Sequence, residues 1–65
     1  MNEYIVYIAP DNNNKGINIK ANSFEDAFLK TVGNYNYREV DKDFPLPDVI
    51  VEKDGIKKYY AIFWG

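Results

Sequence analysis

Residues 17–33 read INIKANSFEDAFLKTVG, and a change of period inside this segment decides the fold. Up to residue 21 every second side chain is apolar, as in a strand with one buried face, at Ile17, Ile19 and Ala21. From residue 24 the spacing becomes that of an amphipathic helix, at Phe24, Ala27, Phe28, Thr31 and Val32. The segment predicts a strand over residues 16–21 and a helix over residues 24–32.

The ends of the predicted helix carry their own signals. Ser23 is a preferred N-cap residue, because its hydroxyl can accept from a free N–H of the first turn. Glu25 and Asp26 follow in that turn, where the helix dipole favours acidic side chains. Gly33 supplies the left-handed conformation with which helices commonly end.

Strand signals lie on both sides of this segment. Residues 3–9, EYIVYIA, are rich in β-branched and aromatic side chains and predict a first strand, followed by a polar loop at residues 11–16. Near the C-terminus, Asp54 and Gly55 predict a tight hairpin between strands at residues 48–53 and 56–64. Residues 34–47, with prolines at 45 and 47, are expected to form an irregular loop that can hold at most a short edge strand.

These elements predict one domain over residues 1–65, of the α+β class. The order is ββαββ, with a mainly antiparallel four-stranded sheet and one helix on one face. A nine-residue helix is about 13 Å long and covers only part of a sheet about 15 to 20 Å wide. The other face of the sheet has no cover within the predicted elements.

Composition removes most catalytic chemistry. The 65-residue chain has no Cys and no His, and its net charge is −2. The chain therefore has no thiolate and no imidazole to serve as a nucleophile, as an acid/base group or as a metal ligand. Asp41, Asp43 and Asp48 lack the glycine turn of a calcium loop and are interpreted as solvated acids. We expect no enzyme, no catalytic residue, no metal and no cofactor, and the longest apolar run is too short to cross a membrane.

Both faces of the first and last strands carry apolar or aromatic side chains, which favours an exposed patch or a buried central strand. Residues 34–47 could fold back over the open face and bury Tyr35, Tyr37, Phe44 and Leu46, which is the competing interpretation. The residues expected to bind a partner are the aromatic side chains of these segments and the single arginine: Tyr4, Tyr7, Tyr35, Tyr37, Arg38, Phe44, Tyr59, Tyr60 and Trp64.

The sequence favours a non-enzymatic module that binds a protein partner through an aromatic sheet face. Its high content of Asn, Lys, Ile and Tyr is typical of AT-rich coding, so we expect a cytoplasmic inhibitor from a phage or mobile element that blocks a larger host protein. Three alternatives stay open: a homodimer formed through the same face, a small-molecule (nucleotide) binder using Arg38, and a single-strand nucleic-acid binder using Lys57 and Lys58 beside Tyr59. Nucleic acid is the less favoured partner, because the net charge is negative.

Overall fold

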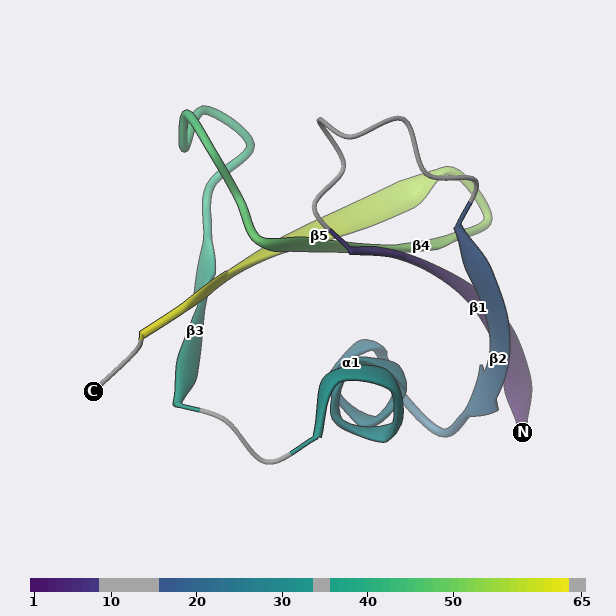
Figure 1. The fold of residues 1–65 in the computed structure, drawn as a ribbon. Helices are drawn as coiled ribbons and strands as arrows, with labels where there is room; N and C mark the ends of the chain where they lie inside the picture. The colour runs from purple at the N-terminus through teal and green to yellow at the C-terminus, as the bar shows by residue number, and fades with distance from the viewer. Residues whose placement is uncertain (9–15, 34–35, 64–65) are drawn as a thin grey trace.

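Five antiparallel strands of the computed structural model form one sheet in the order β2-β1-β4-β5-β3, which curves around a helix (Figure 1). The structure describes residues 1–8, 16–33 and 36–63. The elements in chain order are β1 (Asn2–Ile8), β2 (Ile17–Ala21), α1 (Phe24–Val32), β3 (Tyr37–Val40), β4 (Val49–Lys53) and β5 (Ile56–Ile62). The α+β class and the antiparallel sheet agree with the sequence prediction.

The helix has the predicted bounds, and its caps show why. The Ser23 hydroxyl accepts from the Asp26 N–H at 3.0 Å, which satisfies one of the free donors of the first turn. At the other end, the Gly33 N–H donates to the Leu29 carbonyl at 2.9 Å, and Gly33 has a φ of 94°. Both caps were readable from sequence because they are local.

The core lies between α1 and the concave face of the sheet. Phe28 is fully buried, and its ring stacks on Tyr60 of β5, with centroids 4.7 Å apart. Tyr4 of β1 meets Phe24 edge-on at 5.0 Å. Buried valines of β1 and β4 complete the layer beneath the helix, at Val6, Val49 and Val51. Aromatic contacts therefore hold the helix to both halves of the sheet.

The four-strand prediction was wrong in one element, since part of the expected loop 34–47 is the fifth strand. β3 pairs with β5 at an edge of the sheet, so the described order is ββαβββ. Two adjacent charged residues, Arg38 and Glu39, break the apolar alternation that would have marked a strand. The strand forms because its partner β5 supplies the hydrogen bonds, which is a long-range effect.

Smaller differences concern the strand ends. The last strand ends at Ile62 rather than at 64, and the first begins at Asn2, while the predicted strand residue Ala9 lies outside the described residues. The predicted two-residue hairpin is present between β4 and β5. Asp54 and Gly55 both have positive φ, 53° and 81°, as a type I′ turn requires.

The helix lies over one side of the sheet. It makes most of its contacts with β1, β2 and β4, and Figure 1 shows it nearer to β1 and β2 than to β3. Two of its side chains also reach the backbone of the edge strand β2 or of the residue after it. The Lys30 ammonium donates to the Lys20 carbonyl at 3.1 Å, and the Asp26 carboxylate accepts from the Asn22 N–H at 2.9 Å. The β5 and β3 half of the sheet therefore has less cover from the helix.

Two glycines with nearly the same backbone give a test of packing beside β1. At Gly16 (φ 79°) a β-carbon would lie 2.7 Å from Ile5 Cγ2 and 2.8 Å from Tyr7 Cε1, whereas at Gly55 (φ 81°) it would meet nothing within 4 Å. Both Gly→Ala variants carry the left-handed strain of about 1 kcal/mol. Gly16→Ala adds overpacking, so we expect its free energy of unfolding to fall by a further 1 kcal/mol, roughly, in urea denaturation. Equal losses in the two variants would contradict the tight contact at Gly16.

Candidate functional site

The structure divides the predicted partner-binding residues between the two faces of the sheet. Tyr4 and Tyr60 are each only 3% exposed and belong to the core beneath α1. This corrects their place in the predicted surface: alternation along a strand separates two faces but does not say which one the helix covers. Tyr37 is half-buried on the same concave face, 4.4 Å from the Phe28 ring.

The remaining candidates lie elsewhere. Tyr7 and Tyr59 are half-buried on the convex face, and Arg38 is exposed on the same side of β3. Phe44 is half-buried and lines a shallow pocket with Arg38 and Val40, whereas Leu46 is 70% exposed. Tyr35 and Trp64 lie outside the described residues.

A continuous row of aromatic and aliphatic side chains crosses the convex face. The strand registers place Tyr7 opposite Ile50, Ile50 opposite Tyr59, and Tyr59 opposite Val40. We call Tyr7, Ile50, Tyr59 and Val40 the outer row. All four are half-buried, and no helix of the described residues covers them.

Polar groups flank the outer row on both sides. On one side Glu52 faces Lys57 across β4 and β5, and the Tyr7 hydroxyl lies 3.3 Å from Glu52 Oε1. On the other, the Arg38 guanidinium lies 5.2 Å from the centre of the Phe63 ring, which is 49% exposed. An apolar centre with a polar rim and a stacked arginine is the usual composition of a protein interface.

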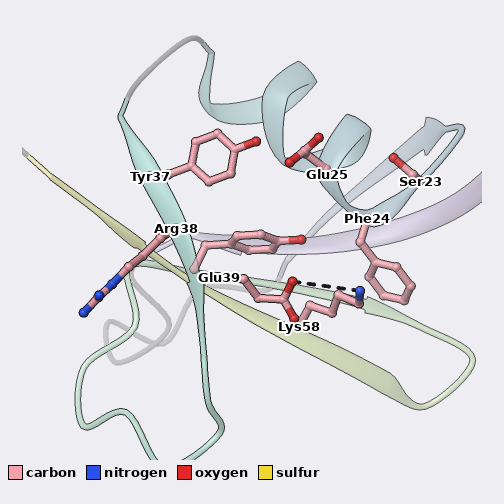
Figure 2. Close-up of a pocket in the computed structure, with 8 residues that line it drawn as sticks. Ser23, Phe24, Glu25, Tyr37, Arg38, Glu39 and Lys58 are labelled. Carbon is pink, nitrogen blue, oxygen red and sulfur yellow. Dashed lines mark ion pairs between the residues drawn. The ribbon is translucent and has the colours of Figure 1, made fainter.

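The concave side has a groove of about 650 Å³ between the N-terminal end of α1 and the half of the sheet formed by β5 and β3 (Figure 2). Its lining combines aromatic, acidic and basic side chains: Ser23, Phe24, Glu25, Tyr37, Arg38, Glu39, Lys58 and Tyr60. Figure 2 shows the Tyr37 hydroxyl directed toward Glu25, and Arg38 directed away from the groove. Only Tyr37, Arg38 and Tyr60 of this group were among the predicted residues.

Two carboxylates and one ammonium set the charge of this groove. Lys58 Nζ lies 4.0 Å from Glu39 Oε1 and 5.2 Å from the centre of the Phe24 ring. A hydrogen bond to the Glu25 carboxylate raises the pKa of Tyr37. Burial, and then the charges of Glu39 and Glu25, raise the pKa of Tyr60 to about 12. The carboxylates of Glu25 and Glu39 therefore contribute to both tyrosine shifts, although burial is the larger cause for Tyr60.

Asp48, one of the three acids considered as a cation site, has a structural role in the sheet. The Asp48 carboxylate accepts the Ile62 N–H at 2.7 Å, and the Asp48 N–H donates to the Tyr60 carbonyl at 2.9 Å. Asp48 therefore fastens the beginning of β4 to β5. Among the described residues there is no group of three acidic, His or Cys side chains that could hold a metal ion.

Sequence reasoning missed Phe24, Glu25, Glu39 and Lys58 as parts of one site. Glu25 is in the first turn of α1 and Glu39 is in β3, so only the three-dimensional fold brings them to one groove. A usable local signal was present, since Tyr37 and Glu39 share a face once residues 37–40 are recognised as a strand.

No family model matches the chain, and comparisons with curated proteins and with solved structures give no match either. None of the described residues belongs to a helix with the length and apolarity needed to cross a bilayer. The site must therefore be interpreted from its own geometry.

The raised tyrosine pKa values predict how stability depends on pH. Because folding disfavours ionised Tyr60, its contribution to the free energy of unfolding is complete below pH 10 and is lost as pH rises toward about 12. We expect urea denaturation over this window to show a smaller loss for Tyr60→Phe, which keeps the ring on Phe28, than for the wild type. The same pH dependence in both proteins would contradict the negative, buried environment of Tyr60.

Proposed function

We propose that the protein is a non-enzymatic binding module that acts by covering a surface of another protein with the convex face of its sheet. The observation that carries this proposal is the outer row, which runs across β1, β4, β5 and β3 at adjoining register positions. In a two-layer domain this face is expected to be polar, because it meets solvent. An aromatic and aliphatic row there is best explained by a partner that buries it.

The chemistry of the row favours a protein as that partner. Tyr7 and Tyr59 offer large, rigid contact areas and a polar hydroxyl, at a small cost in side-chain entropy. Glu52, Lys57 and Arg38 at the margin supply both signs of charge, as a polar rim does. We interpret the module as an inhibitor of a larger protein, of the kind that phages and mobile elements produce.

The arrangement is less suited to nucleic acid. Lys57 and Lys58 are adjacent in sequence, but successive strand residues point to opposite faces. Lys58 lies on the concave face beside Glu39 and Phe24, and Lys57 lies on the convex face opposite Glu52. Each lysine therefore has an acidic neighbour, and the two do not form one basic patch beside Tyr59.

The test compares retention of host proteins by three immobilised baits, using nuclease-treated lysate of a low-GC bacterium. The first bait is the wild type, and the second carries Tyr7→Thr with Tyr59→Thr, since Thr keeps strand propensity. The third carries Leu46→Thr with Ile56→Thr, which removes apolar side chains that are 70% and 60% exposed elsewhere. Circular dichroism is used to check that all three baits are folded before they are compared.

We expect one protein to be retained by the wild type and by the Leu46/Ile56 control, and to be reduced by about tenfold or more on the Tyr7/Tyr59 bait. The same proteins on all three baits would contradict the role of the outer row. Self-association of the wild type in sedimentation equilibrium, abolished by the Tyr7/Tyr59 change, would show that the row joins two copies of this chain instead.

A further inference from the structure

The groove on the concave side adjoins an unpaired strand edge. β3 is the last strand of the sheet, and among the described residues no strand pairs with its outer side. The Phe63 N–H donates to the Asn36 carbonyl at 2.8 Å, so residues 36, 38 and 40 direct their backbone groups toward β5. The N–H and C=O groups of Tyr37 and Glu39 must then point outward from the sheet. Their side chains line the groove.

The opposite edge of the sheet is less open. Lys30 of α1 already binds the backbone carbonyl of Lys20 in β2, and its ion-pair partner at 3.4 Å, Asp26, binds the N–H of Asn22 directly after the strand. Helix side chains that occupy an edge in this way discourage the addition of another strand. No comparable contact from α1 reaches the outer side of β3 among the described residues, which leaves β3 as the edge for strand addition.

The charges on β3 argue against a second copy of this chain as the added strand. The outward backbone groups belong to residues 37 and 39, so these residues must form the hydrogen-bonded pairs in antiparallel pairing with a second copy. Each residue of β3 then faces either the same residue of the copy or one that is an even number of positions away. The two registers that pair three residues of β3 with three of its copy place Arg38 opposite Arg38 or Glu39 opposite Glu39. Like charges directly opposite one another destabilise a sheet. A second copy of β3 is therefore disfavoured as the added strand.

The lining of the groove indicates which kind of side chain it attracts. The side chains directed into the groove include two carboxylates, Glu25 and Glu39, against one ammonium, that of Lys58, while Arg38 points away. Aromatic faces of Phe24, Tyr37 and Tyr60 lie beside these charges. Carboxylates together with aromatic faces attract ammonium and guanidinium groups, and Lys58 over Phe24 already shows that contact within the chain.

We propose that an extended segment of a partner protein adds antiparallel to β3 and inserts into the groove a lysine or arginine side chain that lies directly opposite Tyr37 or Glu39. The backbone of the segment bonds to the outward groups of these two residues, and its cation binds Glu25 and Glu39. Lys58, which lies 4.0 Å from Glu39, competes for that carboxylate. This site is separate from the outer row and does not depend on it.

The probe is the peptide acetyl-Thr-Val-Lys-Val-Thr-amide, titrated into the isotope-labelled protein and followed by amide chemical shifts. We expect millimolar binding, with shifts at β3, Glu25 and Lys58. Norleucine in place of the peptide lysine should weaken binding by about tenfold, the loss of a charge-assisted hydrogen bond. N-methylation of the lysine nitrogen should abolish binding, because that N–H faces β3, while N-methylation of the next valine, whose N–H faces outward, should have little effect.

Protein variants separate the groove from a general effect of charge or folding. Glu25→Gln and Glu39→Gln should each weaken binding severalfold, and Glu3→Gln, which removes the same charge from the outer face of β1, should not. Lys58→Met keeps a long side chain for Phe24 but removes the competing ammonium, so it should tighten binding severalfold. A structural disturbance would not produce that gain. The Tyr7/Tyr59 variant should bind the peptide normally.

Equal affinity for the lysine and norleucine peptides would overturn the proposal, as would shifts confined to the outer row or no shifts at β3. A wild-type protein that dimerises through β3 without peptide would also overturn it, because a second copy would then occupy the edge. Failure of these tests leaves the proposed role of the outer row standing, since that proposal uses the opposite face of the sheet.

Discussion

The stacking of Phe28 on Tyr60 is the contact on which the rest of the structure depends, because it lets a short helix hold a sheet wider than itself. α1 has nine residues and is about 13 Å long, whereas five strands span about 19 Å. The helix lies against β1, β2 and β4, and Phe28 extends its reach to β5 and, through Tyr37, to β3. Without this aromatic bridge the last two strands would lack a core partner on the concave side.

Both proposed binding surfaces exist because the only helix of the described residues covers part of one face of the sheet. The convex face has no helical layer among the described residues, so the outer row remains half-exposed. On the concave face, the offset of α1 leaves a groove over β5 and β3, and Glu25 of its first turn forms one wall. A longer helix would fill that groove with its own side chains and cover the β3 edge. The two surfaces that we propose for recognition therefore lie where the chain lacks residues for packing.

The sequence predicted the features that local spacing determines. The helix and its caps at Ser23 and Gly33, and the turn at Asp54 and Gly55, each depend on a few adjacent residues and are present in the structure. The edge strand β3 was expected only as an option within an irregular loop, and the strand order was not predicted, because both depend on pairing between distant segments. β3 forms against β5, and β1 lies beside β4, although no local pattern relates these strands. The groove was missed for the same reason.

Adjacent residues in β5 show why the sequence identified some residues of the candidate sites but not the face of the sheet on which each one lies. Tyr59 and Tyr60 are the same residue type in the same strand, yet Tyr60 is in the core and Tyr59 is in the outer row. Lys57 and Lys58 are divided in the same way, one beside Glu52 and the other beside Glu39. Alternation fixes that neighbours point to opposite faces, but the position of α1 decides which face becomes core. A cluster of like residues in a strand therefore indicates two half-sites on opposite faces rather than one site.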